Sequence, residues 1–518
     1  MVLTTRTALT GLAAAAIAAT ALGSPINNTN TNSTTNTTTP PVITLASGLE
    51  LHGTVNTTRS PSVAQYLGIP YAAPPTGPRR FAPPEPFASL TDTTIVVDAS
   101  KLPKSCWQYV SVQPGILRTD APEFMIGDAG MSEDCLSVSV WAPRNATGGK
   151  VEGEAKLLLP VIVWFYGGGF ATGGTDVPYQ VPDRYRLNIF GFPNAAALDD
   201  DKQNLGLMDQ RFAVEWIRDN IASFGGDPEQ MVIWGQSAGA VAVDYYNFAH
   251  AADPIVKGLI MDSGTAHLDQ LTSWDLGHTN FTSVARGVGC GNATSDADEL
   301  ACMREVPAWR LEKFVAEYED SGASPSMTFA PRVDNAWVFG NYTERIRDSD
   351  LVSGLPAVVG FNQNEGAFLA PYDAAAGPDA ATVATLGYEF FYCPATKTSL
   401  EREAAGLTTH RYYYAGNFSN VSPAWFDGAY HSSELPQLFG TAADFRGGST
   451  AFEDEVGRAM QDAWVAFAAD PEKGLDGVEW PAWKGLGGDV RQFAVGDVVV
   501  QTGDVVSFEE ECERRGLL

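Results

Sequence analysis

Short apolar runs recur along the chain between longer mixed segments. Residues 157–165 (LLLPVIVWF) form a nearly continuous apolar run, which is typical of a strand buried on both faces of a parallel sheet. Residues 207–228 place Phe212, Trp216 and Ile221 at helical spacing and then reach two glycines, which predicts a helix followed by a turn. Further strands are predicted at residues 231–235, 256–264, 355–360 and 411–416. Strands that alternate with helices in this way predict an α/β protein with a mostly parallel central sheet and helices on both faces.

The N-terminal end differs from the rest of the chain. Residues 1–23 carry one positive charge, at Arg6, and then an Ala-rich apolar stretch with small residues before Ser24, so we expect a signal peptide. The stretch is shorter than the roughly 20 apolar residues that a membrane-spanning helix needs, so we expect no stable membrane anchor. Residues 24–41 are rich in Asn and Thr and predict a disordered leader. No linker-like stretch interrupts residues 42–518, which we expect to form a single domain.

The polar composition fits an exported protein. The net charge of −29 and a pI near 4.5 argue against nucleic acid and anionic membrane surfaces as partners. An even count of six cysteines, with no CxxC or Cys/His cluster, favours three disulfides over free thiols or a metal site, although six cysteines allow 15 pairings. We therefore expect a secreted glycoprotein with Asn-x-Ser/Thr acceptors at Asn27, Asn32, Asn36, Asn56, Asn145, Asn280, Asn292, Asn341, Asn417 and Asn420.

One pentapeptide carries a specific chemical signal. The pattern G-x-S-x-G occurs at residues 235–239 (GQSAG), directly after a predicted strand and before small, helix-compatible residues. In this context the small neighbours allow a strained bend that exposes the hydroxyl of the central serine. The strand and helix context raises the pentapeptide above the level of chance, so Ser237 is predicted to be a nucleophile.

A serine hydroxyl at neutral pH needs a base, most often a histidine that a carboxylate orients. His278, His410 and His431 lie well downstream of the serine, and only His431 follows the last predicted strand, so we expect it to be the base. The acid should follow an earlier strand. In the segment after residues 355–360 the only carboxylate near the strand end is Glu365, which we therefore expect to be the acid.

A third element of such a site is a set of backbone N–H groups that hold the negative oxygen of the tetrahedral intermediate. Gly167, Gly168 and Gly169 directly follow the apolar run 157–165, and glycines permit the close approach that these donors require. Taken alone, three glycines are equally consistent with a flexible turn. Together with Ser237 they predict an oxyanion loop.

At this point the chain resembles the type-B carboxylesterases, the family that includes the cholinesterases and several fungal lipases. The similarity spans nearly all of residues 42–518. The motifs that carry it, in order, are YLGIPYAAPPTGPRRF (66–81), SEDCLSVSVWAP (132–143), YGGGF (166–170), NLGLMDQRFAVEWIRDNIASFGGDP (204–228), GQSAGA (235–240), NEGAF (364–368) and YHSSELPQLFG (430–440). The resemblance implies an α/β-hydrolase fold and ester hydrolysis without a cofactor or a metal.

Carried over position by position, the resemblance implies a full set of site residues. It implies Ser237, Glu365 and His431 as the catalytic triad, and the backbone N–H groups of Gly168, Gly169 and Ala238 as oxyanion donors. It also implies a structural ion pair between Arg80 and Glu133. The disulfides that it implies are Cys106 to Cys135, Cys290 to Cys302 and Cys393 to Cys512.

Two departures from the family pattern bear on the substrate. The only tryptophan in the loop between Cys106 and Cys135 is Trp107, which abuts the first cysteine, so choline esters are disfavoured. Gln236 stands where many relatives have glutamate, which favours neutral acyl groups. The expected partner is a small-molecule or lipid ester. The disulfide loop itself fits either a lipase-like lid or the wall of a gorge.

A third departure bears on activity. Between Phe170 and Asn204 the family has a further strand, which the shorter segment here lacks. An absent strand would leave the run 157–165 without one neighbour, and each orphaned buried backbone group would cost about 1–3 kcal/mol. The expected function is that of a secreted serine carboxylic-ester hydrolase. The alternatives are a member of the family that the missing segment has impaired, and a non-catalytic binding protein.

Overall fold

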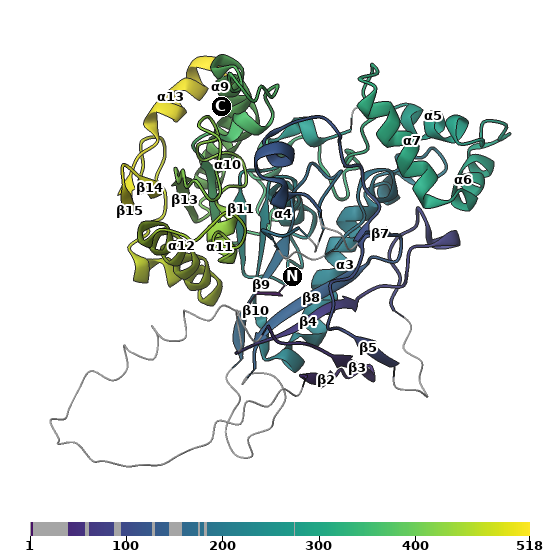
Figure 1. Ribbon diagram of the computed structural model, residues 1–518, viewed down its shortest axis with the longest axis horizontal. Helices are drawn as coiled ribbons and strands as arrows, with labels where there is room; N and C mark the ends of the chain where they lie inside the picture. Colours follow the sequence, from purple (N-terminus) through teal and green to yellow (C-terminus); the bar gives the residue numbers. More distant parts are fainter. Residues whose placement is uncertain are drawn as a thin grey trace, which may run out of the picture.

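A central sheet organises the computed structural model, which describes residues 2–3, 40–56, 62–87, 95–126, 130–144, 158–174, 177–180, 184–273 and 275–518. Ten strands of the described residues form this sheet in the order β15-β14-β13-β12-β11-β10-β9-β1-β8-β4 (Figure 1). They are β1 (Val2–Leu3), β4 (Val63–Pro70), β8 (Ser137–Pro143), β9 (Leu159–Phe165), β10 (Gly226–Gln236), β11 (Gly258–Asp262), β12 (Ala357–Asn362), β13 (Thr409–Tyr414), β14 (Val490–Val495) and β15 (Val498–Gly503).

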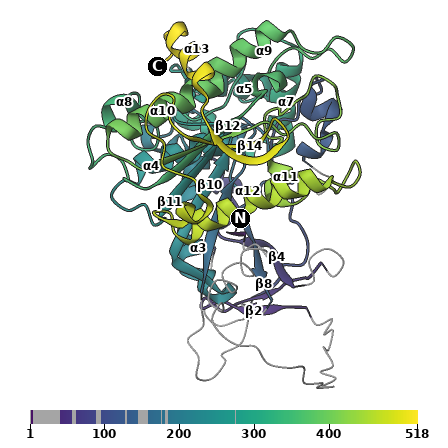
Figure 2. The same ribbon diagram turned by 90° about the vertical axis from the view of Figure 1, so that its left-hand side faces the viewer.

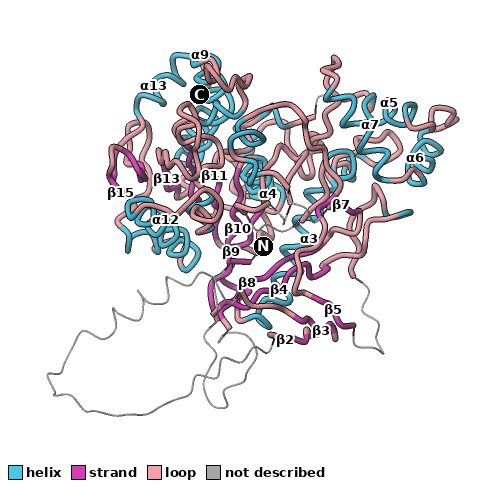
Figure 3. The backbone as a smooth tube through the Cα atoms, viewed as in Figure 1, coloured by secondary structure: helices cyan, strands magenta, loops and turns pink. Residues whose placement is uncertain are grey.

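Neighbouring strands from β9 to β14 are all parallel, which confirms the predicted α/β class. β4 and β15 run antiparallel to their neighbours at the two edges. Every residue of β11, β12 and β13 is buried, as expected for strands covered on both faces. Smaller sheets, visible among the magenta segments of Figure 3, contain β2 (Val42–Thr44), β3 (Leu49–His52) and β5 (Ile95–Asp98), and β6 (Ser105–Cys106) and β7 (Met131–Ser132).

Helices cover both faces of the sheet. In Figure 2, α3, α4 and α10 lie on one side of the central strands and α12 lies on the other. A group of helices formed by α5, α6 and α7 projects from the sheet at the upper right of Figure 1. The α-helices are α2 (Asn188–Gly191), α3 (Leu205–Asn220), α4 (Ala238–Ala249), α5 (Thr279–Gly287), α6 (Asp296–Glu305), α7 (Ala308–Asp320), α8 (Tyr342–Arg345), α9 (Ala380–Gly387), α10 (Cys393–Ala404), α11 (Leu435–Phe439), α12 (Ala451–Ala469) and α13 (Val506–Arg515). None of the helices in the described ranges is long and apolar enough to cross a membrane.

The predicted elements occur close to their expected places. The run 157–165 contains β9, and the helix expected at 207–228 is α3 with a short 3-10 turn after it. That turn ends at Gly225, whose φ of 89° lies in the left-handed region. The predicted strand at 231–235 is longer than expected, because β10 begins at Gly226, where its backbone first pairs with β9.

The segment between Phe170 and Asn204 contains no strand among its described residues. The place between β8 and β9 is instead taken by β1, which pairs parallel with β8 and antiparallel with β9. β1 contributes two residues, whereas β8 and β9 contribute seven each. Most of the facing backbone of these two buried strands therefore has no partner in β1. Apart from β1 and residues 40–41, the expected signal peptide and leader lie outside the described residues, as do the acceptors Asn27, Asn32, Asn36 and Asn145.

Three disulfides tie the outer loops to this core. They join Cys106 to Cys135, Cys290 to Cys302 and Cys393 to Cys512, which are the pairings that the resemblance implied. The last of them closes a separation of 119 residues and holds α13 against the start of α10. This arrangement explains how a cysteine so near the C-terminus reaches a partner in the core.

A buried ion pair links the loop after β4 to the helices of the projecting group. Arg80 is 5% exposed and donates two hydrogen bonds to Glu133, at 2.5 and 2.7 Å. Its remaining nitrogen donates to the carbonyl oxygens of Met303 and Val306, which lie at and just after the end of α6. One guanidinium thus satisfies groups on two segments that are distant from it and from each other in the sequence.

Replacing Arg80 with alanine is expected to lower the free energy of unfolding by about 3–5 kcal/mol, because it leaves a partly buried carboxylate and two carbonyl oxygens without a donor. The change would be measured by urea unfolding. The neighbouring Arg79 provides a matched control, since it pairs with Glu85 at the surface. Arg79→Ala should change the stability by less than about 1 kcal/mol. Equal losses for the two variants would contradict a structural role for the buried pair.

Candidate active site

Ser237 lies in a sharp turn between β10 and α4. Its φ of 57° and ψ of −128° belong to a strained region that a residue other than glycine rarely adopts. The two flanking glycines make the turn possible. A Cβ atom at Gly235 would lie 2.2 Å from the carbonyl oxygen of Gly239, and one at Gly239 would lie 2.0 Å from that of Phe165. The sequence pattern therefore folds into the strained bend that it predicted.

His431 faces the turn from the loop after β13, and Glu365 lies behind it at the end of β12. The Nδ1 atom of His431 is 2.5 Å from a carboxylate oxygen of Glu365. The other carboxylate oxygen accepts hydrogen bonds from the backbone N–H of Asn362, at 2.7 Å, and from the hydroxyl of Ser263. Both side chains are buried, so this geometry holds the proton on Nδ1 and leaves Nε2 as an acceptor.

Aromatic rings fix the plane of the imidazole. The ring of Phe368 stacks on His431 with centroids 4.3 Å apart and an interplanar angle of 12°, and Phe391 packs against it at 4.6 Å. Phe368 belongs to the short 3-10 helix η7 (Glu365–Phe368), which also carries the acid. The imidazole is therefore held both by its hydrogen bond and by apolar contacts that exclude water.

The glycine loop passes directly in front of Ser237. A Cβ atom at Gly167 would lie 2.8 Å from the Cβ of Ser237, which shows how closely the two segments approach. Gly168 and Gly169 both have positive φ, at 109° and 63°, and both line the same cavity as Ser237 and His431. Ala238 is the first residue of α4, so its N–H has no partner within the helix. The structure thus brings all six predicted catalytic and oxyanion residues together.

The cavity at this site has a volume of about 340 Å³. Apart from the imidazole, no ionisable side chain lines it among the described residues. Its apolar walls are formed by Leu117, Phe124, Met125, Val177, Leu268, Leu271, Phe368, Leu369, Phe390 and Phe391. The arrangement therefore favours a neutral, largely apolar ligand.

One wall comes from the loop between Cys106 and Cys135, for which a lid and a gorge wall were both considered. Polar bonds tie this loop down at several points. Tyr372 donates to the carboxylate of Asp120 at 2.8 Å, and Arg446 pairs with Glu123 at 2.5 Å. The backbone N–H of Tyr179 donates to the carbonyl oxygen of Glu123 at 3.2 Å. In this structure the loop is a tethered wall of the cavity.

Gln236 contacts the predicted base. Its side-chain nitrogen lies 3.1 Å from Nε2 of His431, and the side chain is 2% exposed. With the imidazole proton on Nδ1, the amide donates to Nε2. The residue before the nucleophile thus places a neutral dipole where a glutamate would place a negative charge.

Replacing Gln236 with glutamate is expected to move the acid limb of the kcat/KM profile upward by roughly one pH unit, because a nearby carboxylate stabilises the imidazolium. The profile would be measured with a neutral nitrophenyl ester between pH 4 and 9. Gln236→Met removes the hydrogen bond without adding charge, so its acid limb should move less than that of Gln236→Glu. Coincident limbs for the wild type and Gln236→Glu would contradict a direct interaction.

Two further carboxyl groups, neither of them predicted, lie behind the acid. Asp262 accepts a hydrogen bond from the indole of Trp234 at 2.5 Å, and Glu434 accepts one from the side-chain amide of Asn362. Burial raises the pKa of Asp262 to about 8 and raises the pKa of Glu434 well above its usual value, with neighbouring carboxylates adding to both shifts. Burial therefore favours the protonated, neutral form of both groups.

The raised pKa of Asp262 should make the free energy of unfolding fall as the pH rises. Unfolded aspartate titrates near pH 4, so between about pH 4 and 8 the folded protein holds a proton that the unfolded chain has released. We expect Asp262→Asn to reduce this decline by up to about 5 kcal/mol over that window. Thermal melts of both proteins from pH 4.5 to 8 would measure it, and parallel curves would contradict the assignment.

The predicted ion pair and disulfides lie outside the cavity and serve the fold. Several residues that complete the site were not predicted, namely Ser263, Phe368, Phe391 and Glu434. A weak signal existed for two of them. Phe368 follows Glu365 by three residues in NEGAF, and Glu434 follows His431 by three in HSSEL, so each lies one turn beyond a predicted site residue.

The chain is similar to several known proteins. A family model described as the carboxylesterase family matches residues 39–381. Secreted lipase 5 of Gibberella zeae is 41% identical over 496 residues, which cover 88% of this chain and 91% of the relative. Chlorogenic acid esterase of Aspergillus niger is 39% identical, with 88% and 90% covered. Human carboxylesterase 5A is 29% identical, with 81% and 79% covered.

Proposed function

This chain belongs to the carboxylesterase family, and on that basis we propose that it is a secreted serine hydrolase that cleaves neutral carboxylic esters through an acyl-enzyme. The observation that carries the proposal is that Ser237 and His431 line one apolar cavity, with Glu365 bonded to Nδ1 of His431 behind it. Export is supported by the name of the fungal relative, secreted lipase 5, and by the apolar N-terminal stretch. Residues 42–518 act as one domain in this proposal.

Acylation follows from the placement of the three side chains. The hydroxyl oxygen of Ser237 attacks the ester carbonyl carbon while its proton passes to Nε2 of His431. Glu365 stabilises the imidazolium through Nδ1. The carbon–oxygen bond to the alcohol then breaks, and the alcohol leaves with the proton that His431 returns. The acyl group remains as an ester on Ser237.

Deacylation repeats the sequence with water in place of the alcohol. His431 accepts a proton from the water as the water oxygen attacks the acyl carbon, and the carboxylic acid leaves as Ser237 regains its proton. In both steps the backbone N–H groups of Gly168, Gly169 and Ala238 hold the negative oxygen. No cofactor takes part in this proposed cycle.

The cavity favours neutral, apolar esters of either aliphatic or aromatic acids. The names of the two fungal relatives point to both classes, one a lipase and the other a chlorogenic acid esterase. A series of nitrophenyl esters with acyl chains from two to sixteen carbons, compared with an aromatic cinnamoyl ester, would separate them. A maximum at long chains would favour a lipase, and a preference for the aromatic acyl group would favour the second class.

The first test is active-site labelling with a fluorophosphonate, read by mass spectrometry and peptide mapping. It needs no choice of substrate. Stoichiometric label on Ser237 is expected, because phosphonylation requires the strained serine, the base and the oxyanion donors together. A folded but unlabelled protein would refute the proposal and favour a family member impaired by the short segment after Phe170.

A further inference from the structure

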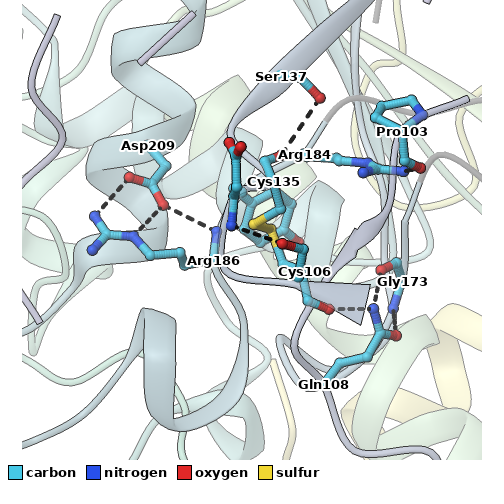
Figure 4. The surroundings of a disulfide bond; sticks show 12 residues. Pro103, Cys106, Gln108, Cys135, Ser137, Gly173, Arg184, Arg186 and Asp209 are labelled. Atoms are coloured by element: carbon cyan, nitrogen blue, oxygen red, sulfur yellow. Dashed lines mark hydrogen bonds and ion pairs between the residues drawn. A yellow bond between two sulfur atoms is a disulfide. The ribbon is translucent and has the colours of Figure 1, made fainter. Parts of the chain in front are cut away.

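The side chain of Gln108 pairs with the backbone of the oxyanion loop, as Figure 4 shows. Its amide nitrogen donates to the carbonyl oxygen of Gly173 at 2.7 Å, and its amide oxygen accepts from the N–H of the same residue at 2.8 Å. A second hydrogen on the nitrogen bonds to the carbonyl oxygen of Cys106 at 3.1 Å. The side chain is fully buried, and it lies two residues after the cysteine of the first disulfide.

Gly173 ends the turn that begins at the oxyanion glycines. The N–H groups of Ala171 and Thr172 both donate to the carbonyl oxygen of Gly168 at 3.0 Å, which closes the turn. A Cβ atom at Gly168 would lie 2.3 Å from the carbonyl oxygen of Thr172. The turn is therefore tight, and a displacement of its end is transmitted to Gly168.

The start of the same loop is held from the opposite side. Tyr166 stacks on Tyr185 with centroids 4.4 Å apart, and each hydroxyl donates to the carbonyl oxygen of the other residue. A Cβ atom at Gly173 would lie 2.3 Å from the ring of Tyr166. The paired tyrosines thus anchor the beginning of the loop, and Gln108 anchors its end.

We propose that Gln108 is a positioning residue that sets the direction of the oxyanion N–H groups by fixing Gly173. The inference rests on the proposed esterase function of this site. A side-chain amide that donates to and accepts from one residue fixes both the position and the orientation of that peptide. A water molecule could satisfy either group, but it could not fix both. Because oxyanion donors act only when their direction matches the transition state, the loss should appear in kcat.

The chain contains a matched control. Gln203 is also buried and makes the same set of three bonds, with the N–H and carbonyl oxygen of Ala195 at 3.0 and 2.9 Å and with the carbonyl oxygen of Leu198 at 3.0 Å. Neither Gln203 nor its partners line the cavity of Ser237. A methionine at either position keeps the length of the side chain and removes all three bonds.

The experiment compares Gln108→Met and Gln203→Met in the full-length protein. We expect Gln108→Met to lower kcat by roughly 10- to 100-fold, which is less than the 10²- to 10³-fold loss on removal of a donor. KM for a nitrophenyl butyrate should stay within a factor of two. The affinity for phenyl trifluoromethyl ketone, which forms a tetrahedral adduct with the serine, should fall by the same factor as kcat. Gln203→Met should lose comparable thermal stability and keep its kcat within a factor of two.

Gln108→Glu gives an independent check. It retains the acceptor for the N–H of Gly173 and loses the donor, so its kcat should lie between those of the wild type and Gln108→Met. The proposal is overturned if Gln108→Met keeps the wild-type kcat, or if the two methionine variants lose kcat equally. Failure of the proposed function is a separate result, because the wild type itself would then neither hydrolyse the ester nor take up the fluorophosphonate.

Discussion

Replacing Ser237 with alanine is expected to lower kcat by roughly 10⁵-fold or more, because removal of the nucleophile of such a triad leaves only the oxyanion donors and substrate binding. Alanine carries a Cβ atom as serine does and adds no bulk, so the strained turn should persist. The variant should therefore melt within a few degrees of the wild type. Hydrolysis of a nitrophenyl ester and uptake of a fluorophosphonate are the two measurements.

Labelling with the fluorophosphonate distinguishes loss of the nucleophile from contamination by another hydrolase. A purified Ser237→Ala protein should carry no label at any serine, while residual turnover from a contaminant would persist at the same level in both preparations. Hydrolysis within tenfold of the wild type, together with a label on another residue, would mean that the nucleophile lies elsewhere.

Replacing Glu365 with glutamine is expected to lower kcat by roughly 10³- to 10⁴-fold, since an amide in this place favours the imidazole tautomer that carries its proton on Nε2. That tautomer cannot accept the proton of Ser237. Binding of the ester should change little, so KM should stay near its wild-type value. Steady-state kinetics at pH 8 measure both constants.

Glu434 supplies the control for this experiment. It is buried in the same carboxyl cluster, and burial raises its pKa and so favours its neutral form, which glutamine resembles. Glu434→Gln should therefore lower kcat by less than about tenfold. If Glu434→Gln lost the larger factor, Glu434 would be the acid and the role of Glu365 would need revision.

The predicted site residues are those that a short local sequence pattern or a nearby predicted strand identifies. The turn at Ser237 needs small neighbours, so its pattern is readable within five residues. Glu365 and His431 could be chosen because each follows a predicted strand, and the carboxyl ends of parallel strands meet at one edge of a sheet. The parallel sheet itself was predictable because its strands are apolar on both faces.

Contacts between distant segments were not predictable. Gln108 and Gly173 meet through an amide and a backbone that are 65 positions apart, and no periodicity links them. The cluster of Asp262, Glu365 and Glu434 forms only when β11, β12 and the loop of the base come together. The position of β1 between β8 and β9 was not predictable either. No pattern in residues 1–3 distinguishes a strand from the start of a signal peptide.

The two-residue strand β1 links the export of the protein to the pairing of its central sheet. Val2 and Leu3 lie within the expected signal peptide, so the same residues are assigned both to export and to the interior of the sheet. A chain cut before Ser24 would lose β1, and with it the pairs that Val2 and Leu3 form with β8 and with β9. The precursor and the exported form should therefore differ in the pairing between β8 and β9. N-terminal sequencing of the secreted protein, together with its elution volume, would show which form the cell releases.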